Sequence, residues 1–166
     1  MKRFHSAACL AFAALAVLGL AGPAAAEKQV PFKGSLEGVV TVAPRNPHLV
    51  FVLVDATANA IGMGQFTLSI PHIGNRATRT AVGTYGFTAG NGDMLFADFT
   101  GKATPTAVPG VLYIEETATI TGGTGRFAGA TGSLTCERRF DTINGTTSGS
   151  FKGTISSPGS SNKSGQ

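Results

Sequence analysis

Apolar and polar residues alternate along much of the chain, which is the period of a β-strand that buries one face. From Phe32 to Val42, every second residue is apolar or glycine, and most residues between them are polar. Gln65 to Ile70 alternates in the same way, and Leu49 to Val54 is continuously apolar, as in a strand covered on both faces. No stretch after Glu27 keeps a helical apolar period, so the pattern predicts an all-β fold.

Turn-forming residues separate these strands. Pro44 to Pro47 and Pro71 to Asn75 predict two turns. Asn91-Gly92 and Asn144-Gly145 each lie between two strand-like stretches. Asn-Gly is the strongest short hairpin signal, so both pairs predict a hairpin with a two-residue loop.

The two ends of the strand-rich region look alike. Phe32-Lys33-Gly34-Ser35 near its beginning matches Phe151-Lys152-Gly153-Thr154 near its end. First and last strands that pair with each other close a sheet and remove its exposed edges. The sequence therefore favours a closed antiparallel β-barrel over a sandwich.

The first 26 residues have the organisation of a cleaved signal peptide. Lys2 and Arg3 precede an apolar stretch, and Ala24 to Ala26 supply a small-residue cleavage site. We expect an exported protein, periplasmic or extracellular, without a permanent membrane anchor. Residues 27–155 are expected to form the barrel domain and residues 156–166 a flexible tail, because the tail is rich in Ser and Gly and has no apolar anchor.

Charge and cysteine content limit the partners that the chain can have. Without Lys2 and Arg3 the basic count falls from 13 to 11 against 9 acidic residues, a net charge of about +2 with no basic stripe, which argues against nucleic acid. The expected mature chain keeps one cysteine, Cys136, so it has no internal disulfide. His48 and His72 both lie beside prolines in predicted turns, and no ligand spacing predicts a metal or another cofactor.

A glycine-rich run from Gly122 to Gly132 stands between two predicted strands. Gly123-x-Gly125-x-x-Ala128 has the spacing of a dinucleotide-binding loop, but that mechanism needs a following helix, which Gly129 and Gly132 disfavour. A tight, shaped connection explains the glycines better. The structural motif comprises Gly122, Gly123, Gly125, Arg126, Phe127 and Gly132.

The pattern Gly-Gly-Thr-Gly-x-Phe-x-x-Ala-x-Gly at 122–132 resembles a signature of dirigent proteins and allene oxide cyclase-like barrels. Asn91-Gly92-Asp93-x-Leu95 and Gly64-x-Phe66-Thr67 are similar to elements of small exported bacterial members of that group. The resemblance implies a calycin-like barrel of eight antiparallel strands, with Arg126 near one end. Ile61-Gly62-Met63-Gly64 stands where many such bacterial chains have Thr-His-Leu-Gly, so chemistry that needs this histidine is not implied.

Hairpin register places several polar residues inside the barrel. A two-residue loop at Asn144-Gly145 pairs Phe140 with Gly149 and Arg138 with Phe151, and Glu116 on the preceding strand then comes close to Arg138. The loop at Asn91-Gly92 pairs Tyr85 with Asp98 and Phe87 with Phe96. The resulting ligand-binding candidates are Tyr85, Phe87, Phe96, Asp98, Glu116, Arg138, Phe140 and Phe151. The polar members are alternatively outside, or form a static network that braces the interior.

Three functions remain open. The first is a noncatalytic barrel that binds an apolar small molecule or serves as an extracytoplasmic accessory protein. The second is a cofactor-free cyclase or isomerase in which Asp98, Glu116 or Tyr85 transfers a proton. The third is an inhibitor-like barrel that binds a protein through its loops. The sequence does not specify the substrate or the oligomeric state.

Overall fold

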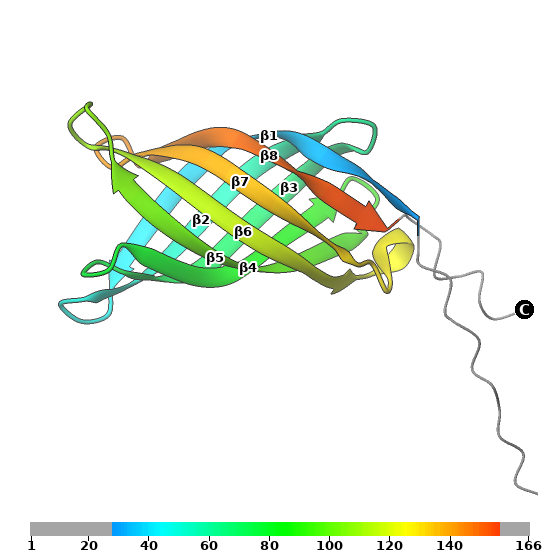
Figure 1. Cartoon of the computed structure of the whole chain (residues 1–166), viewed down its shortest axis with the longest axis horizontal. Helices are drawn as coiled ribbons and strands as arrows, with labels where there is room; N and C mark the ends of the chain where they lie inside the picture. The colour runs from blue at the N-terminus through cyan, green and yellow to red at the C-terminus, as the bar shows by residue number, and fades with distance from the viewer. Residues whose placement is uncertain (1–27, 157–166) are drawn as a thin grey trace, which may run out of the picture.

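Eight antiparallel strands follow one another around a closed barrel (Figure 1). The computed structural model describes residues 28–156, so the predicted signal peptide and all but the first residue of the predicted tail lie outside the described residues. The strands are β1 (Gln29–Pro44), β2 (Leu49–Ala60), β3 (Gly64–Asn75), β4 (Thr80–Ala89), β5 (Met94–Pro105), β6 (Val111–Gly123), β7 (Gly132–Asp141) and β8 (Thr146–Ser156). The predicted all-β closed antiparallel barrel is confirmed.

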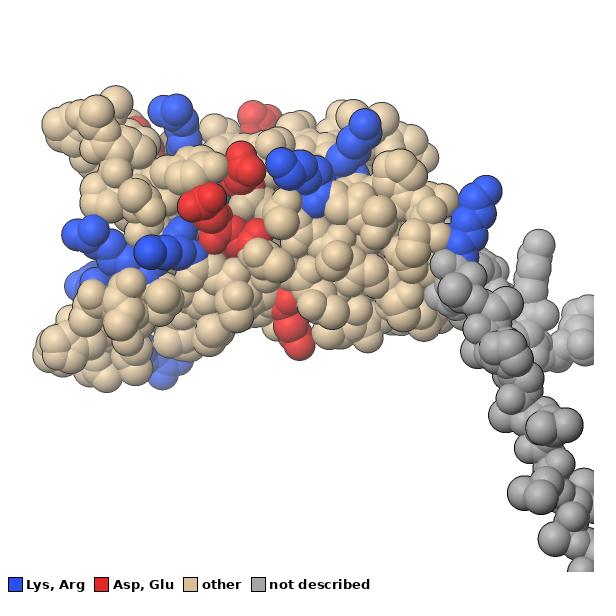
Figure 2. Space-filling model, viewed as in Figure 1, with Lys and Arg blue, Asp and Glu red and all other residues tan. Residues whose placement is uncertain are grey.

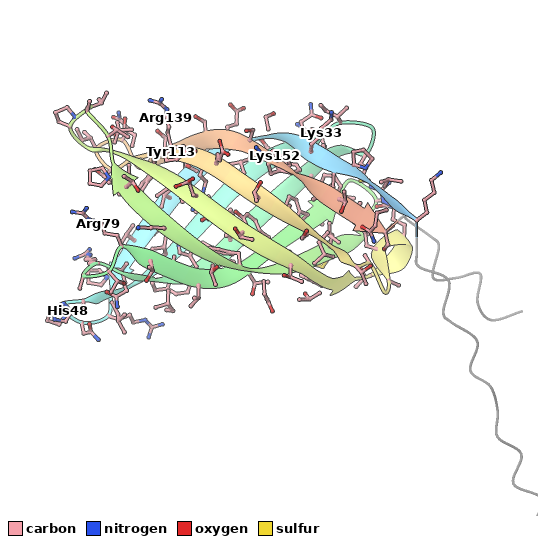
Figure 3. All side chains as sticks on the ribbon, viewed as in Figure 1. Lys33, His48, Arg79, Tyr113, Arg139 and Lys152 are labelled. Atoms are coloured by element: carbon pink, nitrogen blue, oxygen red, sulfur yellow. The ribbon has the colours of Figure 1, made fainter. Side chains whose placement is uncertain are left out.

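Pairing between the first and last strands closes the barrel, as the matching end segments predicted. Phe32 of β1 lies opposite Gly153 of β8, and Gly34 lies opposite Phe151. Lys33 and Lys152 also pair, and both point to the outside (Figure 3). Ser156, assigned from the sequence to the tail, is the last residue of β8 and is held by a backbone hydrogen bond from its N–H to the Thr131 carbonyl (2.7 Å).

The two ends of the barrel differ. The connections 45–48, 76–79, 106–110 and 142–145 lie at one end, which we call the open end and which is on the left in Figure 1. The connections 61–63, 90–93 and 124–131 lie at the other, which we call the closed end. A single turn of 3₁₀ helix, η1 (Gly125–Phe127), covers the closed end.

Aromatic side chains fill the interior beside the closed end. Phe127 of η1 is fully buried and packs against Phe66, and ring centroids within this group lie 5.0–6.5 Å apart. The group consists of Phe32, Phe66, Phe87, Phe127 and Phe151. Arg126 lies over the Phe127 ring, 4.7 Å from its centroid. The glycine-rich run was predicted to be a tight connection between two strands; it also carries Phe127, which fills the closed end, and Arg126, which covers the Phe127 ring.

The hairpin predicted at Asn91-Gly92 has a different register. The Ala89 N–H donates to the Asp93 carbonyl (2.9 Å), so three residues, 90–92, form the loop instead of two. Gly92 has φ +87°, the left-handed residue that such a three-residue loop requires. The extra residue shifts β5 by one position and reverses its facing. Tyr85 consequently pairs with Ala97, while Asp98 pairs with Thr84.

The loop at Asn144-Gly145 is also longer than predicted. Asp141 pairs with Thr146, so the loop has four residues, and Arg138 lies opposite Gly149 rather than Phe151. The Asp141 carboxylate accepts hydrogen bonds from the Ile143 and Asn144 N–H groups (2.9 and 3.0 Å), which adds two residues to the turn. A shift of two positions preserves facing, so Arg138 still points inward.

Two predictions for β2 and β3 were wrong. Leu49 to Val54 is covered on one face only, because Val50, Val52 and Val54 are buried and the residues between them are half-buried on the outside. Pro71 to Asn75 is not a turn but the end of β3, paired with β2 from Pro71 to Asn75. Pro71 is exposed and lacks an N–H, and the pairing with β4, which is interrupted after Ser69, resumes at His72.

Candidate functional site

A cavity of about 490 Å³ occupies the barrel interior at the open end. Its size lies within the usual range for small-molecule sites. Its walls are mostly apolar, and the residues that form them come from strands β1 to β7 and from the connections 76–79 and 142–145. The apolar lining side chains are Val40, Val42, Val50, Val52, Ala81, Ala103, Leu112, Ile114 and Phe140. The aromatic group fills the interior beside the closed end, and the cavity has its mouth at the open end.

A buried ion pair forms the polar floor of the cavity. Arg138 binds Glu116 through two nitrogens, with Nη2 to Oε1 at 2.6 Å and Nε to Oε2 at 3.1 Å. The Tyr85 hydroxyl donates to the same Glu116 Oε2, and Arg138 Nη1 donates to the Thr147 hydroxyl (3.3 Å). Glu116 and Arg138 are 3% and 4% exposed, so both charges are compensated inside the barrel.

The environment fixes the ionisation of Arg138 and of Tyr85, which lies behind the floor of the cavity. Burial would lower the pKa of Arg138, but hydrogen bonds and charge attraction from Glu116 outweigh it, and the pKa lies above its ordinary value. Burial and the nearby Glu116 charge raise the pKa of Tyr85 well above its ordinary value. The guanidinium is therefore charged and the phenol neutral at ordinary pH.

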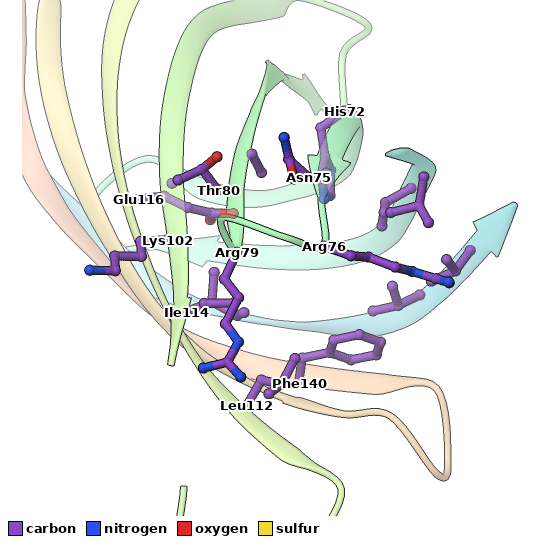
Figure 4. A pocket seen from close by; sticks show the side chains of 18 of the residues that line it. His72, Asn75, Arg76, Arg79, Thr80, Lys102, Leu112, Ile114, Glu116 and Phe140 are labelled. Atoms are coloured by element: carbon purple, nitrogen blue, oxygen red, sulfur yellow. The ribbon is translucent and has the colours of Figure 1, made fainter. Parts of the chain in front are cut away.

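Basic side chains surround the mouth of the cavity. Arg76 and Arg79, from the β3–β4 loop, are exposed and line it, and Figure 2 shows basic groups gathered at this end of the barrel. Figure 3 places Arg79 and His48 there. In Figure 4, Arg79 extends across the opening in the direction of Leu112 and Phe140, whereas Lys102 points away.

The comparisons with known proteins identify the architecture. The structure is similar to that of the pterocarpan synthase dirigent protein GePTS1, with a TM-score of 0.53 and 16% identity over 78% of this chain and 84% of that chain. It is also similar to the pterocarpan synthase dirigent protein PsPTS1, with a TM-score of 0.53 and 15% identity over 80% of this chain and 97% of that chain. The chain has a dirigent-like barrel fold. No protein-family model and no curated protein matches the sequence.

The dirigent-like barrel brings together only part of the candidate set. Glu116 and Arg138 meet as predicted, with Tyr85 beside them. Phe140 lines the cavity. Phe87 and Phe151 face inward but belong to the aromatic group that fills the closed end.

Asp98 and Phe96 were predicted on the inner face, and this was wrong. The one-residue shift of β5 places Asp98 in an exposed position, where its carboxylate accepts a hydrogen bond from the Thr84 hydroxyl (3.0 Å). Phe96 is half-buried on the outer face. Leu95, Ala97 and Phe99 take the inward positions instead, so β5 contributes no charged group to the interior.

Sequence reasoning missed His72. It was assigned to a surface turn, but it points inward from β3, is 8% exposed and lines the cavity (Figure 4). Its Nδ1 lies 3.0 Å from the Ile70 carbonyl, and its ring packs against Phe99. The signal that could have revealed it is the continued alternation Phe66, Leu68, Ile70, His72, which the neighbouring Pro71 obscured. His48, by contrast, is exposed in a turn as predicted.

Burial lowers the pKa of His72 below its ordinary value of 6.5, with Arg138 adding to the effect and the Ile70 carbonyl and Glu116 opposing it. The folded barrel therefore holds a neutral imidazole at pH values where the unfolded chain is protonated. The contribution of His72 to stability is complete above about pH 6.5 and is lost as the pH falls toward the lower folded pKa.

We expect His72→Leu to weaken the pH dependence of urea unfolding between pH 7.5 and 5.5. His48→Gln is the control and should keep the wild-type slope; equal slopes in both variants would contradict this origin.

Cys136 is buried beside Tyr85 and Glu116 at 1% exposure. Burial, aided by the Glu116 charge, raises the pKa of its thiol to about 12. The thiolate is the nucleophilic form of cysteine, and the raised pKa keeps Cys136 as a neutral thiol. The folded barrel should therefore resist alkylation. In a chain that begins at Glu27, we expect intact mass after maleimide treatment at pH 8 to show no adduct until urea is added. Complete labelling of the folded protein within minutes would contradict this.

Proposed function

We propose that the chain is an exported, noncatalytic barrel that binds an apolar small molecule in the cavity at the open end. The observation that supports this most directly is the cavity itself, which is lined mainly by aliphatic side chains. Aromatic rings fill the interior beside the closed end, so we expect a ligand to enter from the open end. Export rests on the signal-like residues 1–26.

The placement of polar groups favours binding over proton transfer. Glu116 is bound by Arg138 and Tyr85 and compensates a buried charge. Tyr85 is 1% exposed and does not line the cavity, and Asp98 lies on the outer face. Of the three proton-transfer candidates, only Glu116 contacts the cavity, and its engagement suits a brace for the floor better than an acid or base.

Fluorescence of a neutral apolar probe tests the binding proposal. N-phenyl-1-naphthylamine becomes bright in apolar surroundings, and it can be excited directly at wavelengths that tryptophan does not absorb. We expect saturable binding to the folded barrel and at least a tenfold loss in Ala103→Trp, which fills the cavity from β5. The matched control is Thr104→Trp, which adds the same ring at the next, exposed position.

Two results would overturn the proposal. One is the absence of saturable probe binding to a barrel that circular dichroism shows to be folded. The other is equal binding by Ala103→Trp and Thr104→Trp, which would place the probe outside the cavity.

Export is tested separately by intact mass of the protein recovered outside the cytoplasm of its own host, where we expect the chain to begin at Glu27. Retention of the uncleaved chain inside the cell would contradict export.

A further inference from the structure

The charge around the cavity is unequally distributed. Among the residues that the structure describes, Glu116 is the only carboxylate that lines the cavity, and Arg138 compensates its charge. Arg76 and Arg79 stand at the rim, and neither has an ion-pair partner within residues 28–156. A molecule in the cavity is therefore in contact with apolar walls inside the barrel and with uncompensated positive charge at the mouth.

The backbone at Arg79 provides an independent observation. Arg79 has φ +58° and is the only non-glycine residue in the described chain with a positive φ. Glycines take the corresponding conformation in the neighbouring connections, at Gly62, Gly92, Gly110 and Gly145. An arginine in this conformation costs about 1 kcal/mol relative to glycine. Within residues 28–156 the Arg79 side chain makes no hydrogen bond or ion pair that would stabilise the turn, so the strained position is best explained by the guanidinium that it holds at the mouth.

The loop that carries both arginines is well anchored. Asn75 Oδ1 accepts hydrogen bonds from the Ala77 and Thr78 N–H groups (2.9 and 3.2 Å). The Arg76 N–H donates to the His48 carbonyl (2.7 Å), and the Arg79 carbonyl accepts from the Ala103 N–H (2.8 Å). The backbone origins of the two side chains are thus fixed relative to β1–β2 and to β5, which limits the entropy lost when a ligand is bound.

We propose that Arg76 and Arg79 bind the anionic group of the ligand, and that the cavity takes organic anions whose apolar body enters the barrel first. Guanidinium groups match the oxygens of a carboxylate, sulfonate or phosphate in a forked geometry. The aliphatic walls accept the apolar body, and the neutralised floor offers no competing charge. This inference rests on the proposed function and adds the chemical class and orientation of the ligand.

Two probes that differ by one charged group test the inference. 8-Anilino-1-naphthalenesulfonate has the rings of N-phenyl-1-naphthylamine plus a sulfonate. We expect the wild-type barrel to bind the sulfonate probe more tightly, with an affinity that falls as salt rises, while the neutral probe is insensitive to salt. Arg79→Gly should weaken the sulfonate probe about fivefold to tenfold and leave the neutral probe unchanged.

Arg79→Gly also separates charge from folding. It removes the guanidinium and relieves the positive-φ strain, so thermal unfolding should show equal or higher stability while anion affinity falls. Arg76→Gln should have a similar effect on the sulfonate probe. Arg139→Gln is the matched control. Arg139 is exposed on the outer face of β7 and does not line the cavity, so this substitution removes the same charge at a distance from the proposed site.

The outcomes distinguish the two proposals. If neither probe binds the cavity, the proposed function fails. If the neutral probe binds but the sulfonate probe is no tighter, or if Arg139→Gln weakens it as much as Arg79→Gly, the binding function stands and the anion site is overturned. A selective loss in Arg79→Gly and Arg76→Gln, absent in Arg139→Gln and in the neutral probe, supports the anion site.

Discussion

Replacing Arg138 by Met is expected to destabilise the barrel by about 3–5 kcal/mol, because it leaves the Glu116 carboxylate buried without its counter-charge. Both groups are almost fully buried, and two nitrogens of Arg138 contact the carboxylate. The Tyr85 hydroxyl alone cannot compensate a full charge at this depth. Urea unfolding followed by circular dichroism measures the loss.

The exposed ion pair between Lys152 and Glu137 provides the control. Its nitrogen and oxygen are 3.7 Å apart, and the two side chains are 74% and 49% exposed. Lys152→Met should therefore cost no more than about 1 kcal/mol. The double variant Glu116→Leu with Arg138→Met should recover most of the stability lost in the single variant, since it removes both charges. A cost below about 1 kcal/mol for Arg138→Met would show that the carboxylate does not depend on this partner.

The sequence predicted the architecture because short segments of it identify the strands and indicate which two strands close the barrel. Alternation places Phe66, Leu68 and Ile70 on one face, and the matching end segments identify β1 and β8 as partners. Facing along β7 was also predicted correctly, although its hairpin loop is two residues longer than expected. An even-numbered error leaves the inside and outside of a strand unchanged.

The candidate site was predicted only in part, because it depends on loop length and on contacts between distant strands. One additional loop residue at Asn91-Gly92 was enough to exchange Asp98 and Phe96 for Ala97 and Leu95 on the inner face. The Asp93 carboxylate accepts hydrogen bonds from the Asn91 amide (2.9 Å) and from the Arg126 N–H (3.2 Å), so this loop is held in part by a segment 33 residues away. No local pattern at Asn91-Gly92 encodes that contact.

The mouth of the cavity was missed for a related reason. Arg76 and Arg79 are in a polar stretch that has no strand period, and their importance follows from the connection that carries them to the open end. His72 was missed because a proline beside a histidine suggests a turn, whereas Pro71 here occupies an outward position in β3. In both cases, tertiary placement determines what the residues face.

Substitution of Gly132 by Ala should be among the most destabilising single changes in the glycine-rich run. Gly132 has φ +143°, and a Cβ there would lie 2.2 Å from the Thr154 carbonyl oxygen and 3.0 Å from the Ile155 Cα. Both neighbours are backbone atoms of β8, so relief requires moving a strand that pairs with β1 at the closure of the barrel. We expect a loss of more than about 3 kcal/mol in the free energy of unfolding, from backbone strain and steric overlap together.

Two other glycines separate these contributions. Gly122 has φ +130° but open space where a Cβ would be, so Gly122→Ala should show the backbone cost alone, about 1–3 kcal/mol. Gly90 has neither a positive φ nor a neighbour within 4 Å, so Gly90→Ala should change stability by less than about 1 kcal/mol, with a gain expected from the stiffer unfolded chain. The predicted order of stability in urea is Gly90→Ala, then Gly122→Ala, then Gly132→Ala. Equal losses of stability in Gly122→Ala and Gly132→Ala would contradict this order. They would mean that the β8 backbone at Thr154 moves away from the new Cβ at little cost, although β8 pairs with both β1 and β7.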